Sequence, residues 1–171
     1  MLFSVNLLKQ RISIPSDYND IKDKLIAKLF EIEHGEVSRI LPDLVVIGKV
    51  TSVEKHPNAD TLFVCQLDCG SHGNYQICTG GENVASGQFV PVALPGCYLP
   101  AINLEIGARK LRGLDSNGMI CSKTELGINE DADQHWIWDM QKDLACDDSM
   151  IGKKFKDVFP WFENTIFEVE A

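Results

Sequence analysis

From Leu44 onward the chain alternates short β-rich runs with turns, and this pattern constrains the fold more than any other feature. The runs are rich in β-branched and aromatic residues, and glycine, proline, asparagine or aspartate separates them. The strands expected from this pattern are 44–53, 62–68, 75–79, 89–94 and 119–122. Several short strands with Gly/Pro turns are typical of a small β-barrel or sandwich.

Two residues inside these runs predict local irregularities. Gly48 predicts a kink in the first strand, and Pro91, which has no amide hydrogen to donate, predicts an edge position or a bulge. The number of strands fits a five-stranded barrel of the oligonucleotide/oligosaccharide-binding type (OB-fold). We therefore expect residues 44–149 to form an OB-fold barrel.

The two ends of the chain carry different patterns. Ile21, Leu25 and Leu29 recur every four residues, which indicates an amphipathic helix. Residues 32–40 and 165–170 are strand-like. We expect residues 1–43 and 150–171 to pack together as a small, discontinuous and incomplete α/β subdomain with the barrel inserted in it, an α+β fold. Because the chain stops on a strand, we also expect it to be cut from a longer protein.

The charge and the cysteines limit the class of protein. The formal net charge is −9, but most of it lies in residues 128–171, which hold 4 basic and 11 acidic residues. A nucleic-acid site would therefore have to be local. No apolar run reaches the roughly 18 residues of a membrane helix, and no secretory signal is evident. The six cysteines include no Cys-x-x-Cys pair, which predicts reduced core thiols; a zinc site at Cys65 and Cys69 would need two more ligands.

The candidate binding residues gather around a basic cluster. Arg109, Lys110 and Arg112 lie within four residues, and a turn rich in Gly, Asp, Ser and Asn is expected at 113–118. Cations and small polar donors suit contacts to phosphates and 2′-hydroxyl groups, although an ordinary basic surface turn has the same composition. The complete candidate set is Lys49, Lys55, His56, Asn58, Arg109, Lys110, Arg112, Asn117, Ser122 and Lys123. For His56, a loop histidine ordered by its neighbours Pro57 and Asp60 is the alternative.

The tryptophans of residues 135–140 offer a second candidate feature. The alternation predicts a strand with Trp136, Trp138 and Met140 on one face. Tryptophan can stack on nucleobases. The surrounding carboxylates would repel phosphates, so packing is the favoured interpretation. The chain contains no phosphate-binding loop and no nucleophile elbow, so we expect no catalytic and no metal-binding residues.

Several phrases of the chain resemble a known family. Gly48-Lys49-Val50, the phrase HPNADTL at 56–62 and the phrase RGLDSNGM at 112–119 resemble the tRNA-binding domain of the methionyl-tRNA synthetase extension, of aminoacyl-synthetase cofactor and cytokine proteins, and of bacterial phenylalanyl-tRNA synthetase β subunits. Residues 4–9, 77–84, 92–100 and 119–127 are similar to the β subunit in particular. In place of the basic residue usual in that family, Glu105 precedes the basic cluster.

The resemblance implies a non-catalytic tRNA-binding module of a cytoplasmic, ATP-dependent phenylalanine–tRNA ligase, helping to bind tRNA(Phe). Its partners would be tRNA, the remainder of the β subunit and the catalytic α subunit in an α2β2 heterotetramer, without a membrane. ATP and Mg²⁺ are implied for the whole enzyme and no cofactor for this chain. Two alternatives remain: a free-standing tRNA-binding or chaperone-like OB-fold protein, and an architectural domain with weak RNA contact.

Overall fold

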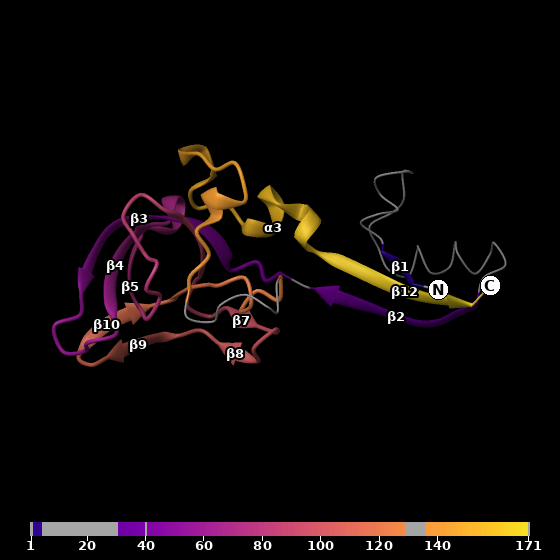
Figure 1. Cartoon of the computed structure of the whole chain (residues 1–171), viewed down its shortest axis with the longest axis horizontal. Coiled ribbons are helices and arrows are strands. Elements are labelled where there is room, and N and C mark those ends of the chain that lie inside the picture. The colour runs from indigo at the N-terminus through magenta and orange to yellow at the C-terminus, as the bar shows by residue number, and fades with distance from the viewer. Residues whose placement is uncertain (1, 5–30, 40, 129–135, 171) are drawn as a thin grey trace. The chain divides into compact units, whose positions relative to one another are not determined.

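The computed structural model describes residues 2–4, 31–39, 41–128 and 136–170. The chain divides into two compact units, one formed by Leu41–Pro160 and the other by Met1–Ile40 with Trp161–Ala171 (Figure 1). The helix expected around Ile21, Leu25 and Leu29 lies outside the described residues.

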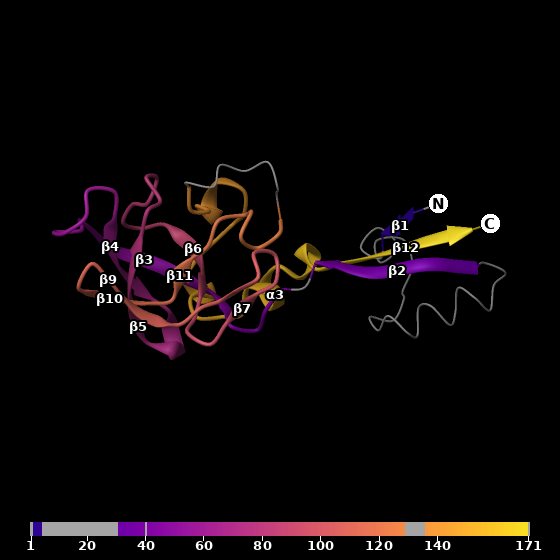
Figure 2. The ribbon, with the colours of Figure 1, turned by 90° about the horizontal axis from the view of Figure 1, so that it is seen from below.

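The unit 41–160 is built on a five-stranded antiparallel sheet. Its strands are β3 (Val45–Lys55), β4 (Phe63–Asp68), β5 (Asn74–Thr79), β6 (Phe89–Ala93) and β11 (Met119–Ile120), in the order β11-β6-β3-β4-β5. A further strand, β10 (Leu114–Asn117), lies along the open side of β5: the Cys78 amide donates to Ser116 Oγ at 3.0 Å, and Gln76 Nε2 donates to the Asp115 carbonyl at 2.8 Å. The sheet thus curls into a nearly closed barrel, as expected for an OB-fold (Figure 2).

Strand β3 is the central strand of the five-stranded sheet. It pairs with β4 on one side and with β6 on the other. Val45, Val46 and Ile47 are completely buried, because the sheet covers one side of this segment and residues 152–155 cover the other. The irregularity of β3 lies between Val50 and Ser52, where the pairing register with β4 shifts.

At Gly48 itself the pairing with β6 is regular, and the glycine also has a packing role. A Cβ atom at this position would lie 2.7 Å from Val92 Cγ2, so the glycine leaves room for the Val92 side chain. Pro91 is not in an edge strand either, because β6 lies between β3 and β11. It is tolerated because the two-residue β11 pairs only with Val92 and Ala93 and so requires no amide from Pro91.

Smaller elements complete the unit. They are η1 (Gly70–His72), β7 (Tyr98–Leu99), β8 (Leu104–Glu105), β9 (Ala108–Leu111), η2 (Met140–Lys142), η3 (Asp148–Met150) and α3 (Phe155–Val158). The strand predicted for 135–140 is wrong over its described part: residues 136–139 are irregular, and Met140 begins η2. Among the helices that the structure describes, none has the length and apolar character needed to cross a membrane.

Residues 150–160 belong to the barrel unit, whereas the sequence-based boundary left them outside it. The Gly152 amide donates to the Ile47 carbonyl at 2.7 Å, and the Ile47 amide donates to the Lys153 carbonyl at 2.9 Å. Phe155 is fully buried, and its ring contacts Trp138 at a centroid distance of 5.6 Å. Hydrogen bonds and aromatic packing therefore extend the unit to Pro160.

The second unit contains a three-stranded antiparallel sheet. Strands β1 (Leu2–Ser4), β2 (Glu31–Arg39) and β12 (Asn164–Glu170) lie in the order β1-β12-β2, and η4 (Pro160–Phe162) precedes β12 (Figures 1 and 2). Segments from opposite ends of the chain are therefore paired, as their strand-like patterns suggested.

The six cysteines are all free thiols, as predicted, and five of them are buried. Burial raises the pKa of Cys65 and of Cys69 to about 12 and that of Cys97 to about 11, because a buried thiolate loses its hydration. Cys146 is the partly exposed thiol.

This difference in exposure predicts selective alkylation. At about pH 8, iodoacetamide should label Cys146 in the native protein, with a rate that rises with pH as more thiolate forms. Peptide mass spectrometry should find the other five labelled only when denaturant is added. Rapid native labelling of Cys65 or Cys69 would contradict the buried core described above.

The packing of Phe155 predicts a large effect on stability. Phe155→Ala should lower the free energy of unfolding of the barrel unit by about 3–5 kcal/mol, because it removes a fully buried ring and leaves a cavity. Denaturant titration followed by the fluorescence of Trp138 measures this change. Leu104→Ala, at a residue that is 38% exposed, is the control and should cost about 1 kcal/mol or less. A cost of about 1 kcal/mol or less for Phe155→Ala would show that residues 150–160 do not stabilise the barrel.

Candidate nucleic-acid interface

The basic cluster forms a β-hairpin that the sequence analysis did not anticipate. Strands β9 and β10 are antiparallel, with Leu111 opposite Leu114, so only Arg112 and Gly113 form the turn. Their φ angles are +51° and +93°, and a two-residue turn with both values positive is type I′. The turn predicted at 113–118 is therefore shorter and earlier, and residues 114–117 are a strand.

Arg112 is an unusual residue for this turn. A positive φ costs a non-glycine residue of order 1–3 kcal/mol unless the surroundings hold it in place. Gly113 meets the same requirement without that cost. The conformation places the Arg112 side chain on the exposed tip of the hairpin.

The loop after β3 holds this turn. His56 is 5% exposed; its Nδ1 accepts the Asn58 amide at 3.0 Å, and its Nε2 lies 2.8 Å from the Leu111 carbonyl. Because Nδ1 is an acceptor, the ring is neutral and carries its hydrogen on Nε2, which donates to Leu111. Asn58 Nδ2 donates to the Arg112 carbonyl at 3.1 Å. Two candidate ligand residues, His56 and Asn58, thus bind and position the basic hairpin.

The three cations of the hairpin are exposed but differ in their surroundings. Lys110 lies opposite Asp115, with 3.7 Å between Nζ and Oδ1, and at this exposure such a pair contributes about 0–1 kcal/mol. Arg109 lies opposite Ser116. Neither Arg109 nor Arg112 has an ion pair with any residue that the structure describes. The hairpin thus presents two guanidinium groups and one weakly paired ammonium group.

Two further candidates lie close to the basic cluster: Lys55 precedes the loop that binds the hairpin, and Asn117 is the last residue of β10. Lys55 is exposed at the end of β3, directly before the His56 loop, and has no ion pair within the described ranges. Asn117 is partly buried at the end of β10, opposite Ala108. Lys55 is therefore an additional cation near the turn.

The candidates Lys49 and Lys123 form ion pairs within the protein. Lys49 Nζ lies 2.7 Å from Asp148 Oδ1, and Lys123 Nζ lies 2.6 Å from Asp143 Oδ2. The hydrogen bond from Lys123 is the main cause of the lowered pKa of Asp143. Both lysines are bound to carboxylates and are less available to phosphates than Arg109 or Arg112.

Ser122 begins the turn that follows β11. Its hydroxyl accepts the Glu125 amide at 3.1 Å, and the Glu125 carboxylate accepts the Ser122 amide at 2.7 Å. This reciprocal arrangement is a capping box. The Ser-x-x-Glu spacing is the sequence signal of this motif.

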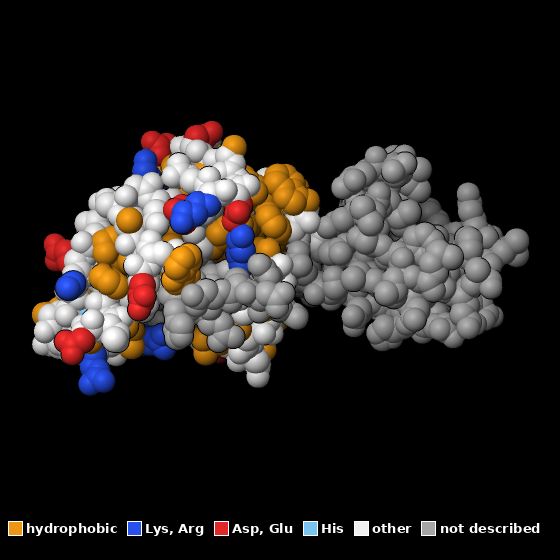
Figure 3. All heavy atoms as spheres, viewed as in Figure 1, with side chains coloured by type: hydrophobic (Ala, Val, Ile, Leu, Met, Phe, Trp, Pro, Cys, Tyr) orange, Lys and Arg blue, Asp and Glu red, His pale blue; other side chains and the backbone are white. Residues whose placement is uncertain are grey.

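The surface around these elements is mixed in charge. On the face drawn in Figure 3, lysines and arginines stand singly among acidic and apolar side chains. No continuous basic surface is visible on that face, which agrees with the net charge of −9. Any attraction for a phosphate backbone must therefore be local.

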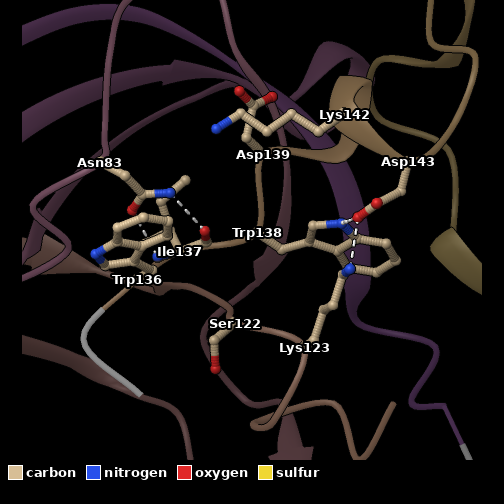
Figure 4. A pocket seen from close by; sticks show the side chains of 9 residues that line it. All are labelled: Asn83, Ser122, Lys123, Trp136, Ile137, Trp138, Asp139, Lys142 and Asp143. Atoms are coloured by element: carbon tan, nitrogen blue, oxygen red, sulfur yellow. Dashed lines mark hydrogen bonds and ion pairs between the residues drawn. The ribbon is translucent and has the colours of Figure 1, made fainter. Parts of the chain in front are cut away.

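The two tryptophans expected on one face have different environments (Figure 4). Trp138 is 4% exposed; its Nε1 donates to Asp143 Oδ2 at 2.8 Å, and Lys123 Nζ lies 5.3 Å from its ring centre. Trp136 is 50% exposed at a hollow of about 230 Å³. Asn83, which sequence reasoning missed, fixes the backbone between them through two 2.9 Å hydrogen bonds with Ile137. Packing is thus confirmed for Trp138 and not for Trp136.

The hydrogen bond between His56 and Leu111 predicts that substitution of His56 makes the β9–β10 hairpin open more easily. His56→Ala removes the donor to the Leu111 carbonyl, so the free energy of opening the β9–β10 hairpin should fall by about 1–3 kcal/mol. Hydrogen exchange of the amides in 108–117 measures this change. Lys55→Ala, at the exposed preceding residue, should leave it unaltered. Unchanged protection in His56→Ala would mean that the loop does not hold the hairpin.

Comparison with known proteins finds relatives of this chain. The chain is 44% identical over 133 residues to the phenylalanine–tRNA ligase beta subunit of Synechococcus sp. (strain CC9605), and 44% identical over 135 residues to that of Symbiobacterium thermophilum. Each match covers 78% of this chain but only 16% and 15% of the respective subunit. The chain thus spans about a sixth of the length of these relatives.

A solved structure, the C-terminal domain of Plasmodium vivax p43, matches with 22% identity and a TM-score of 0.37, over 68% of this chain and 75% of that one. The family model described as "Putative tRNA binding domain" matches residues 45–145. That range contains the barrel strands, the His56 loop and the basic hairpin, and it covers more than half of the chain. The chain therefore belongs to the family of putative tRNA-binding domains.

Proposed function

We propose that this chain is a non-catalytic tRNA-binding module of a phenylalanine–tRNA ligase β subunit, helping to bind tRNA(Phe) for aminoacylation. The observation that carries the proposal is the hairpin bound by His56 and Asn58. On it, Arg109 and Arg112 are exposed and have no ion pair among the described residues. Family membership and the identity to ligase β subunits support it. Guanidinium groups suit phosphate oxygens, because their planar donors can bind two oxygens at once.

The hairpin suits phosphate binding because its position is fixed before a ligand arrives. His56 binds the carbonyl group of Leu111, the last residue of β9, and Asn58 binds the carbonyl group of Arg112 in the turn. Binding then has to order only the tips of the basic side chains, which lowers the entropic cost of association. Lys55, which directly precedes His56, adds a further cation. We retain Asn117 as a candidate donor and rank Lys49, Ser122 and Lys123 below it because of their internal contacts.

The wider assembly is part of the same proposal. The rest of the β subunit and a catalytic α subunit, in an α2β2 heterotetramer in the cytoplasm, would be the protein partners. ATP and Mg²⁺ would bind to that remainder of the enzyme. Within this chain, residues 1–40 and 161–171 would form a small α/β subdomain around the inserted barrel; the pairing of β2 with β12 supports this.

Removal of the basic cluster should weaken tRNA binding in a salt-dependent way. Replacing Arg109, Lys110 and Arg112 by alanine removes up to three phosphate contacts, so the slope of log affinity against log salt should fall by about 2–3. Because phosphate contacts carry little sequence information, the loss should be similar for different tRNAs. Titration of tRNA across a salt series, with thermal melting in parallel, measures both quantities.

The chain provides a matched control for this experiment. Lys153, Lys154 and Lys156 have the same spacing as the basic cluster, but Lys154 and Lys156 approach Asp43 Oδ1 at 3.6 and 2.6 Å. Hydrogen bonding and charge from Lys156 lower the pKa of Asp43. The triple alanine variant of these lysines changes the net charge equally and should retain the slope. A folded cluster variant with unchanged affinity would instead favour an architectural domain.

A further inference from the structure

We propose, as an extension that rests on the proposed function, that Trp136 and Arg109 form a binding site for an unpaired nucleobase of the RNA. The indole ring would stack on the base, and the guanidinium group would bind an adjacent phosphate. This site combines the segment that begins at Trp136 with the basic hairpin.

Trp136 and Arg109 line the same cavity. A cavity of about 260 Å³ opens between the end of β5, strand β9, strand β11 and the segment that begins at Trp136. Because alternate residues of a strand share a face, Arg109 and Leu111 line this cavity while Lys110 does not. Trp136 also borders the 230 Å³ hollow of Figure 4, so it forms the wall between the two.

The size and chemistry of this cavity favour a part of a polymer over a free metabolite. Pockets for drug-sized molecules are about 300–1,000 Å³ and are mostly enclosed, whereas this cavity is smaller and bordered by exposed residues. Its lining includes the apolar side chains of Leu62, Met119 and Ile120 and the backbone of Gly80 and Gly81. The lining thus mixes apolar side chains with polar groups, and Trp136 and Arg109 stand at its exposed border; an aromatic ring beside a cation suits a planar base that carries a phosphate.

The exposed state of Trp136 supports a ligand at this position. An indole ring buries a large apolar area when it is packed, yet Trp136 is 50% exposed and has no ring partner within the described ranges. Its neighbour Trp138 contacts Phe155 and donates to Asp143. Two tryptophans two residues apart thus divide into one that stabilises the unit and one that is available for stacking.

The nearby carboxylates do not exclude a phosphate from this rim. Glu125 lines the cavity, but its carboxylate accepts the amide of Ser122. Asp143, on the far side of Trp136, is paired with Lys123. Arg109, in contrast, lines two cavities and has no carboxylate partner among the described residues. Glu125 keeps its negative charge, and Arg109 is the cation of this lining that no described carboxylate pairs with.

The test separates stacking from charge. The probes are a single-stranded RNA of eight adenylates and an abasic ribose-phosphate strand of equal length, both titrated by fluorescence anisotropy with the full chain. The wild type should bind the adenylates about 5- to 100-fold more tightly than the abasic strand, because a base stacked on an aromatic ring contributes on that scale. Trp136→Ala should reduce the adenylate affinity to the abasic level without changing the salt slope. Trp136→Phe should retain most of the affinity but lose the quenching of tryptophan fluorescence.

Two further variants complete the design. Arg109→Gln should lower the salt slope by about 1 for both probes, because it removes one phosphate contact. Trp161→Ala, at a tryptophan that is 57% exposed in the other unit, is the matched control and should change neither affinity.

The outcomes distinguish this site from the proposed function. If the wild type binds tRNA and Trp136→Ala binds the adenylates equally well, the nucleobase site is overturned while the tRNA-binding module stands. If AMP alone quenches Trp136 as strongly as the adenylate strand does at equal concentration, the cavity is a free-nucleotide site and the proposal is also overturned. Failure of the wild type to bind tRNA and both strands overturns both proposals.

Discussion

Strand β3 is the element on which the rest of the barrel unit depends. It pairs along both edges, and residues 152–155 cover the side of its first half that the sheet leaves open. Its last residue, Lys55, leads directly into His56, which binds the turn of the basic hairpin. The same strand therefore connects the best-packed part of the structure to the candidate interface. A site held by rigid elements keeps its geometry better than one carried by a free loop.

The distribution of ion pairs explains how an acidic protein can carry a site for a polyanion. No continuous basic surface is visible on the face drawn in Figure 3, and several lysines are bound to carboxylates within the unit. Surface pairs of this kind contribute little stability, but they neutralise the cation for an approaching phosphate. Arg109 and Arg112 lie on β9 and in its turn, where no carboxylate of the described residues forms an ion pair with them.

The barrel was predictable from the sequence, and the hairpin was not. Alternating apolar residues between turns located β3, β4, β5 and β6 to within a few residues. Strand β9 escaped this reasoning because three of its four residues are exposed, so Ala108–Leu111 shows no apolar alternation. The sequence leaves His56 open as a ligand or a loop residue. Only its contact with Leu111, 55 residues away, shows that it binds the hairpin. Contacts at such separation leave no local pattern.

The sequence by itself determined the family, the strand pattern, the reduced cysteines and the position of the basic cluster, because these depend on residue type and local spacing. The tertiary structure alone decided which cations remain unpaired and which tryptophan is buried. Lys49 meets Asp148 across 99 residues, and Trp138 turns toward Phe155 while Trp136 faces a cavity. The physical reason is that the burial of a side chain and the pairing of a charge depend on which surfaces folding brings together. Two residues of the same type that are close in the sequence can therefore have different surroundings in the folded protein.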